Sequence, residues 1–252
     1  MEWYQYLIAI VGGAIAGGIN TLAGNGSAIT LSILTEVIGL PGNLANGTNR
    51  VGVLTQSTAG SWAFYQHGKL DFSRSKLNIS LTVLGAIIGV GVAINVSNEQ
   101  FIFVFKYLML AMFVVLLVKP KRWLAATQKD PQINYFLAVP LYLALGFYGG
   151  FIQMGMGIFY LATMVLVAKY SIIEGNALKS FVVALYTIIV LAIFQWRGLV
   201  QWEVGLVLAL GQTFGGWYTA KFASKHPKAN IIAYWVLMVI VVVVLGRLFF
   251  KL

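Results

Sequence analysis

The chain has 252 residues, of which 60% are hydrophobic and only 10% are charged, with a mean hydropathy of +0.85. A soluble domain carries about a quarter charged residues, so this composition excludes an ordinary soluble fold. The formal net charge is +10, but the basic residues lie in short connections between apolar blocks, which argues against a nucleic-acid partner. Because the chain has no cysteine, disulfides, thiolate metal sites and cysteine nucleophiles are excluded. We predict no metal and no cofactor.

The apolar residues form long blocks that predict transmembrane helices in a lipid bilayer, and hence an all-α polytopic membrane protein. A full span needs about 20 apolar residues, and the segments that reach this length are 44–66, 75–96, 100–118, 172–195, 202–223 and 229–249. Four other segments are shorter: 4–17, 28–40, 134–149 and 157–169. An arm of about 13 residues reaches only about 20 Å, whereas the hydrocarbon layer is about 30 Å thick. The short segments come in pairs joined by glycine-rich sequence, which predicts broken or re-entrant helices.

The order of one short pair followed by three spans occurs twice, and the two halves resemble each other in sequence. GGINTLAGNGSA (Gly17–Ala28) aligns with YGGFIQMGMGIF (Tyr148–Phe159), and LGAIIG (Leu84–Gly89) aligns with LGQTFG (Leu210–Gly215). These matches indicate an internal repeat of about 130 residues. We predict a first membrane repeat at 1–118, a cytoplasmic linker at 119–133 and a second membrane repeat at 134–252.

The distribution of basic residues predicts that the two halves are inverted. A re-entrant pair enters and leaves on one side, so each half crosses the membrane an odd number of times. With both termini outside, the cytoplasmic connections would hold Lys69, Arg74, Lys76, Lys119, Lys121, Arg122, Lys129, Lys169, Lys221, Lys225 and Lys228. Only Arg197 and Lys251 would then lie outside, which is a strong positive-inside asymmetry. We therefore predict a multi-pass protein of the inner membrane with extracytoplasmic termini.

The glycine-rich breaks suggest a binding site. Backbone groups that a broken helix leaves unpaired are tolerated in a membrane only where protein or a watery cavity surrounds them, and inverted repeats place such breaks near the midplane, where transporters bind substrate. The second arms start at Ser27 and Gly157, and their free N–H groups and positive dipole ends favour an anion. The alternative is that the glycines only pack helices tightly, and we expect this role for the glycines of LGAIIG and LGQTFG.

Two basic residues lie inside predicted spans, namely Arg50 and its expected counterpart Lys179. Such a residue costs about 2.5–3.5 kcal/mol at the centre of a helix on insertion scales and therefore usually marks a function. Two alternatives stay open. Lys179 could pair with Glu174 or extend to the membrane interface, and Arg50 could extend to the outer interface.

Together these features predict a site for an anion between two cations and two helix starts. The predicted substrate-binding residues are Asn20, Gly24, Asn25, Gly26, Ser27, Asn46, Thr48, Asn49, Arg50, Gln153, Gly155, Gly157, Asn176 and Lys179. A membrane enzyme is the less favoured reading, because both histidines lie in loops and no aspartate lies within a span, so no catalytic residue is predicted.

The glycine-broken first segment, ANGTNR (Ala45–Arg50) and HGKLDF (His67–Phe72) resemble the TauE/SafE sulfite exporter family over nearly the full chain. The positions that match the family's pattern are Gly17, Gly18, Gly24, Gly26, Gly47, Thr48, Asn49, Arg50, Gly68 and Asp71. The chain departs from that pattern at Asn25, where many members have a third glycine, and at Ala28–Leu31, where many have a proline. The resemblance implies an inner-membrane transporter of sulfite, sulfonates and related sulfur-containing anions.

We therefore predict a secondary transporter of a small sulfur oxyanion or organosulfonate, working by alternating access; the alternative is an anion-selective channel. The sequence leaves open which sulfur anion moves and in which direction. It also leaves open whether a proton is coupled through Glu36 or Glu174, and it is compatible with a homo-oligomer.

Overall fold

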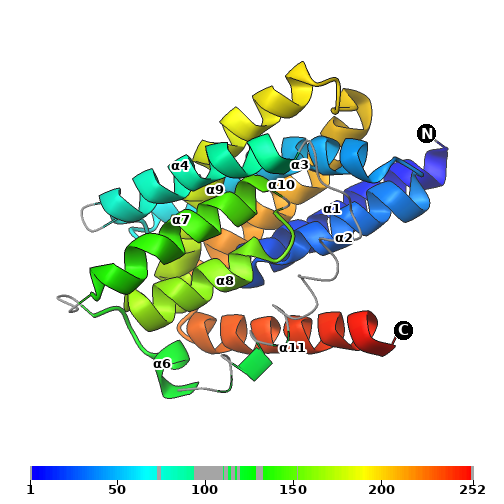
Figure 1. The fold of residues 1–252 in the computed structure, drawn as a ribbon. Helices are drawn as coiled ribbons and strands as arrows, with labels where there is room; N and C mark the ends of the chain where they lie inside the picture. Colours follow the sequence, from blue (N-terminus) through cyan, green and yellow to red (C-terminus); the bar gives the residue numbers. More distant parts are fainter. Residues whose placement is uncertain are drawn as a thin grey trace.

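The computed structural model describes residues 2–72, 75–93, 110, 113–114, 117, 120–128, 133–151 and 153–250. Over these residues the chain is a bundle of helices without a strand (Figure 1), which confirms the all-α prediction. The first half contains α1 (Trp3–Ala23), α2 (Gly26–Ser32), the π-helical η1 (Ile33–Val37), α3 (Gly42–Gln66) and α4 (Lys76–Ala93). The rest contains α6 (Pro120–Leu124), α7 (Tyr135–Phe151), α8 (Met156–Ala162), the π-helical η2 (Thr163–Val167), α9 (Ile172–Trp196), α10 (Trp202–Lys225) and α11 (Ala229–Phe250).

Three helices of the described residues are long and apolar enough to cross a membrane, namely α1, α4 and α9. Two of them confirm the predicted spans 75–96 and 172–195. Helix α1 corrects the sequence prediction of a short arm at 4–17, because it runs for 21 residues and includes the polar Asn20 and Thr21. Helix α3 is as long as α9, with 25 residues each, but polar side chains interrupt its apolar sequence. The predicted span 100–118 lies largely outside the described residues.

Helices α1 and α2 form an antiparallel hairpin. Gln5 Nε2, near the start of α1, donates to the carbonyl of Val37 at the end of η1 at 2.8 Å. At the turn, Gly26 lies so close to α1 that a Cβ there would be 2.0 Å from the Ala16 oxygen. The second arm therefore returns to the side from which the first arm entered, as the sequence predicted for a re-entrant pair.

The elements of the two halves recur with a constant spacing. Helices α2 and α8 begin at 26 and 156, the π-helices at 33 and 163, and α3 and α9 at 42 and 172, which is an offset of 130 residues each time. Left-handed residues recur at the same offset, at Gly39 and Lys169 and again at Gly68 and Gly198. The repeat is thus visible in the helices, whereas the inverted orientation of the two halves in a membrane stays a prediction.

The halves interlock through glycine-rich helix pairs, since α1 packs along α10 and α4 packs along α7 (Figure 1). In α4, a Cβ on Gly85 would lie 2.2 Å from the Leu143 oxygen of α7. In α10, a Cβ on Gly215 would lie 1.9 Å from the Ala14 oxygen of α1. Gly89 and Gly211 make equally close contacts. These distances confirm the prediction that the glycines of LGAIIG and LGQTFG pack helices closely.

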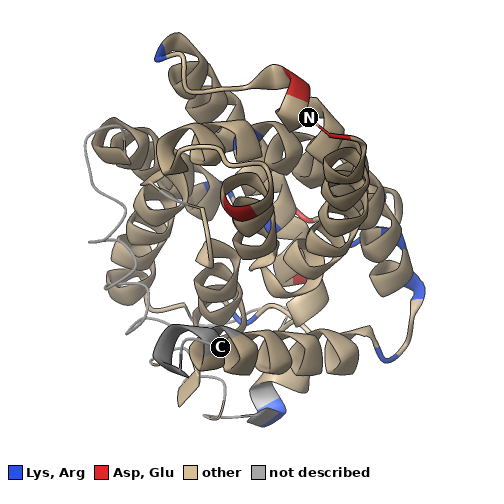
Figure 2. Cartoon of the chain, turned by 90° about the vertical axis from the view of Figure 1, so that its right-hand side faces the viewer, with Lys and Arg blue, Asp and Glu red and all other residues tan. Residues whose placement is uncertain are grey.

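The outer surface and the direction of the helices suit a membrane bundle. Large apolar side chains such as Leu84 on α4 and Phe214 on α10 are more than half exposed, and Figure 2 shows most charged residues in connections and at helix ends. The start of α1 and the end of α11 lie at the same end of the bundle (Figure 1). Helices α3 and α9 run in opposite directions, because a Cβ on Gly47 near the start of α3 would lie 1.9 Å from the Leu199 oxygen, just beyond the end of α9.

Candidate functional site

The turns of the two hairpins touch each other in the interior. A Cβ on Gly24 would lie 2.3 Å from the Gly157 carbonyl carbon, and a Cβ on Gly157 would lie 2.4 Å from Gly24 Cα. Real Cβ atoms do not approach so closely, so the two backbones can meet only because both residues are glycine. Gly24 also has a φ of +79°, a conformation that glycine adopts without strain.

The second turn is one residue longer than the first. Gly24 and Gln153 are equivalent, because both are left-handed and both donate their N–H to the carbonyl five residues earlier. Gly155, with a φ of +77°, is then an extra left-handed residue before α8 begins. The predicted alignment of Gly24 with Gly155 and of Gly26 with Gly157 is therefore wrong by one residue, and Gly157 corresponds to Ser27.

The Arg50 side chain is fully buried and reaches across to the second half. Its Nη1 donates to the Gly149 carbonyl at 2.9 Å and to Gln153 Oε1 at 2.7 Å, and its Nη2 donates to the Gly150 carbonyl at 3.3 Å. These carbonyls belong to the last turn of α7, where the helix itself supplies no partners. Arg50 thus caps a broken helix, and the alternative that it extends to the outer interface is wrong.

Lys179 does the same in the opposite direction. Its ammonium, 3% exposed, donates to the carbonyls of Asn20 at 2.7 Å and Thr21 at 3.1 Å in the last turns of α1 and to Asn176 Oδ1 at 2.5 Å. Three acceptors match the three N–H donors of an ammonium. Lys179 therefore neither extends to the interface nor pairs with Glu174.

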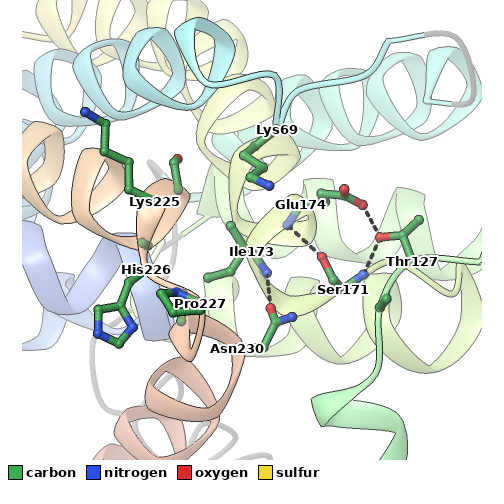
Figure 3. Close-up of a pocket in the computed structure, with 13 residues that line it drawn as sticks. Lys69, Thr127, Ser171, Ile173, Glu174, Lys225, His226, Pro227 and Asn230 are labelled. Atoms are coloured by element: carbon green, nitrogen blue, oxygen red, sulfur yellow. Dashed lines mark hydrogen bonds between the residues drawn. The ribbon is translucent and has the colours of Figure 1, made fainter.

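Glu174 instead belongs to a polar cluster at one end of the bundle. It accepts a short hydrogen bond from the Thr127 hydroxyl, which in turn accepts the Ser171 N–H at 2.7 Å (Figure 3). These residues and Lys69 line a cavity of about 340 Å³ formed by the starts of α9 and α11, the end of α10 and the α3–α4 connection. The cavity is separate from the hairpin turns, about eight residues or 12 Å along α9 from Lys179.

Two asparagines complete the reciprocal caps. Asn46 Nδ2 on α3 donates to the Phe151 carbonyl of α7 at 3.4 Å, and Asn176 Nδ2 on α9 donates to the Leu22 carbonyl of α1 at 2.9 Å. Both asparagines are related by the offset of 130 residues, and their acceptors hold equivalent places in α1 and α7. Each half therefore supplies an asparagine and a cation that close the end of the other half's first arm.

The two cations themselves are not at matching positions. The offset of 130 residues pairs Lys179 with Asn49 and Arg50 with Ser180. The sequence prediction that Arg50 and Lys179 are counterparts is thus wrong by one helical position. They still reach equivalent carbonyls, because Arg50 contacts residues 149 and 150 while Lys179 contacts residues 20 and 21. The longer arginine side chain compensates for its different place on the helix.

The electrostatic balance of this region favours an anion. Among the described residues, the partners of Arg50 and Lys179 are carbonyl and amide oxygens and never a carboxylate. The carboxyl end of a helix is equivalent to only about half a negative charge, so each capped end leaves part of a positive charge uncompensated. Burial makes such a charge costly, which a bound anion would relieve.

Several predicted residues keep unpaired polar atoms at this site. Within the part of the chain that the structure describes, buried atoms without a hydrogen-bond partner include Asn25 Oδ1, Ser27 Oγ, Asn49 Nδ2 and Arg50 Nε. Three of these four are donors and suit an oxyanion. Thr48 does not share this property, because its hydroxyl accepts the Gln201 N–H at 3.0 Å and joins α3 to the start of α10.

Three side chains that the sequence analysis did not select support the site. The Thr30 hydroxyl and Gln212 Nε2 both donate to Asn49 Oδ1, at 2.7 and 3.4 Å, and so turn its amide nitrogen away from them. Tyr186 donates its hydroxyl to Gln153 Oε1 at 2.9 Å. A buried glutamine within an apolar helix was the available signal for Gln212, whereas tyrosine in a span is too common to single out.

A helical bundle that spans a membrane and encloses two broken hairpins and two buried cations defines a membrane transporter rather than a soluble protein. The model of the family Sulfite exporter TauE/SafE matches residues 9–248, and the chain belongs to this family of membrane transporters. This confirms the resemblance drawn from the sequence.

Relatives that cover most of the chain agree with this assignment. Probable membrane transporter protein ORF9 of a Sinorhizobium species is 25% identical over 224 residues, which are 88% of this chain and 85% of the relative. Probable membrane transporter protein YfcA of Escherichia coli K12 is 26% identical over 205 residues, 80% of this chain and 74% of the relative. A probable membrane transporter protein of Haemophilus influenzae is 25% identical over 220 residues, 87% of this chain and 85% of the relative. No solved structure matches the chain.

Proposed function

We propose that this protein is a secondary transporter that binds a small sulfur oxyanion, sulfite first among them, between the touching turns of its two hairpins. The observation that carries the proposal is the meeting of Gly24 and Gly157 beside two buried cations without carboxylate partners. The family description supports sulfite as the first substrate to test. Sulfonates and thiosulfate-like anions share its oxygen acceptors and belong to the same proposal.

The proposed ligands are the donors that have no partner of their own. Ser27 Oγ, Asn49 Nδ2 and Arg50 Nε are buried and unpaired among the described residues. The first turns of the apolar helical segments Gly26–Val37 and Met156–Val167 add backbone N–H groups and positive dipole ends. Leaving a buried donor unsatisfied costs about 1–3 kcal/mol, so an oxyanion that satisfies several of them gains affinity.

The reciprocal caps suggest how binding is linked to movement. Arg50 and Lys179 hold the two first arms against the opposite halves, and this keeps the turns closed around the site. An oxyanion competes with the capping carbonyls for the same N–H groups. When it takes over the Arg50 guanidinium, the hold on α7 weakens and the second hairpin can move against the first half. The opposite directions of α3 and α9 support inverted halves, which such alternating access needs.

Sulfite flux into liposomes tests the proposal. Arg50→Gln removes the charge and should reduce flux to the background of empty liposomes, because carbonyls cannot replace a cation in binding an anion. Arg197→Gln is the matched control, since Arg197 is exposed and its guanidinium lies over the Trp196 ring 5.7 Å from the centroid. Normal flux through Arg50→Gln would remove the site from this region.

Exchange kinetics separate the transporter from the anion-selective channel. A transporter that must bind an anion in order to change state should take up labelled sulfite faster when unlabelled sulfite is inside the liposome, and its rate should saturate. A channel gives neither acceleration by internal sulfite nor saturation in the same range. Either of those channel results, with Arg50→Gln still inactive, would replace the transport mechanism and keep the site.

A further inference from the structure

A series of buried hydroxyl and amide side chains leads away from the proposed site through the second half. It starts at Gln153 Oε1, which accepts hydrogen bonds both from Arg50 and from the Tyr186 hydroxyl. Tyr160 on α8 then donates its hydroxyl to Asn78 Oδ1 on α4 at 2.5 Å. Tyr142, which also hydrogen-bonds to Asn78, packs in one buried cluster with Tyr160 and Tyr186. We call Tyr186, Tyr160, Asn78, Tyr142, Tyr170 and Ser75 the polar file.

The polar file continues to one end of the bundle. The Tyr170 and Ser75 hydroxyls are 3.0 Å apart, and Ser75 also contacts the Asp71 carbonyl in the α3–α4 connection at 3.2 Å. Tyr170 immediately precedes Ser171, which lines the cavity of about 340 Å³ that also contains Lys69 (Figure 3). The file therefore joins the region of the hairpin turns to the end of the bundle where basic residues gather.

All members of the polar file are at most 5% exposed, and one further polar atom beside it lacks a partner. Thr82 lies one helical turn after Asn78, on the same face of α4. Its hydroxyl is fully buried, with no hydrogen-bond partner in the described part of the chain. Burying a polar group without a partner is unfavourable, so packing alone does not explain why this face is polar.

The equivalent places in the first half are apolar. Leu40 corresponds to Tyr170, because each follows a left-handed residue and each donates its N–H to the carbonyl six residues earlier. Val204 corresponds to Asn78, because each lies seven residues before a closely packed glycine, Gly211 and Gly85. The counterparts pack in a dry cluster: Ala9, Leu34, Ala45, Val204 and Leu208, with Leu40 at its edge.

We propose that the polar file is the route by which a small oxyanion passes between the hairpin turns and the end of the bundle formed by the α3–α4 connection, and that the apolar cluster closes the opposite route. The inference rests on the proposed function. Tyrosine hydroxyls and an asparagine amide supply neutral O–H and N–H donors, which can replace water around an oxyanion without holding it as a cation would. No carboxylate lies among these side chains to repel it.

Single cysteines test the route directly, because the chain has none of its own. The probe is 2-sulfonatoethyl methanethiosulfonate, a thiol reagent that is itself an organosulfonate, applied to each face of the membrane separately. Asn78→Cys and Ser75→Cys should be modified several-fold faster than Val204→Cys, and only from the face of the α3–α4 connection. Val204→Cys is the matched control, since Asn78 and Val204 are both buried and hold equivalent places in α4 and α10. Equal rates for the three variants, or no reaction at Asn78→Cys and Ser75→Cys, would overturn the route.

Sulfite flux gives the second measurement. Tyr160→Phe removes only a hydroxyl and should slow flux several-fold, whereas Tyr218→Phe, on an exposed side chain of α10, should leave it unchanged. Unchanged flux in Tyr160→Phe would contradict the route. The two proposals fail separately: normal flux in Arg50→Gln rejects the binding site, while equal cysteine labelling in a protein that still needs Arg50 rejects only the polar file. A pathway for protons alone would also leave Asn78→Cys unlabelled.

Discussion

Replacement of Gly24 by alanine measures how closely the two hairpin turns approach each other. The new Cβ would lie 2.3 Å from the Gly157 carbonyl carbon, and the φ of +79° would add strain of its own. Left-handed backbone costs a residue with a Cβ about 1–2 kcal/mol, and overpacking costs about 1–3 kcal/mol more. Gly39 separates the two contributions, because its φ is +81° and nothing lies within 4 Å of its Cβ position.

The difference between Gly24→Ala and Gly39→Ala should therefore be about 1–3 kcal/mol. For a chain of this size that corresponds to a midpoint roughly 2–12 °C lower for Gly24→Ala in thermal unfolding. Gly157→Ala, which adds the same contact without a left-handed φ, should lose about 1–3 kcal/mol relative to the native protein. The measurement is thermal unfolding of the purified protein in one detergent, followed by sulfite flux. Equal midpoints for Gly24→Ala and Gly39→Ala would show that the turns do not touch, and the proposed site would have to be abandoned.

Two further predictions concern the caps and the helix pairs. Asn176→Ala removes the donor to the Leu22 carbonyl and an acceptor of Lys179, so it should lower stability by about 1–3 kcal/mol; Asn230→Ala, at the surface cavity, should cost less, and a reversed order in thermal unfolding would refute the interior cap. In α4, Gly85→Ala forces a Cβ within 2.2 Å of the Leu143 oxygen and should destabilise by about 1–3 kcal/mol. Gly91→Ala meets no atom within 4 Å and should stabilise the same helix by about 0.5–1 kcal/mol; changes of the same sign in both would contradict the packing of α4 on α7.

The sequence predicted the helical class, the pairing of short segments and the close-packed glycines, because each follows from local composition. It ended the first arm too early. Asn20 and Thr21 look unsuited to a span, yet Asn20 Nδ2 donates to Gln56 Oε1 at 2.9 Å and the Thr21 hydroxyl donates to the Gly17 carbonyl at 2.9 Å. Partners so distant in sequence as Gln56 are supplied by the folded interior, and no periodicity within α1 reveals them.

The site was predicted as a set of residues, but their relations to each other were not. One extra residue in the second turn, Gly155, shifts every match around it, and a glycine-rich stretch offers too few landmarks to locate such an insertion. The cations were recognised by their cost in a membrane. Their acceptors are backbone carbonyls of Gly149, Gly150, Asn20 and Thr21, and every residue has a carbonyl, so side-chain identity carries no sign of them.

The reciprocal caps also determine when the first hairpin can be completed during synthesis. Lys179 follows Asn20 by 159 residues. At about 5–20 residues per second, the last turns of α1 therefore wait roughly 8–32 s for their cation to be made. Until then an already inserted hairpin has exposed carbonyls within the bilayer, so a ribosome that stalls between the halves leaves a nascent chain that the cell's quality-control machinery can recognise as unfinished.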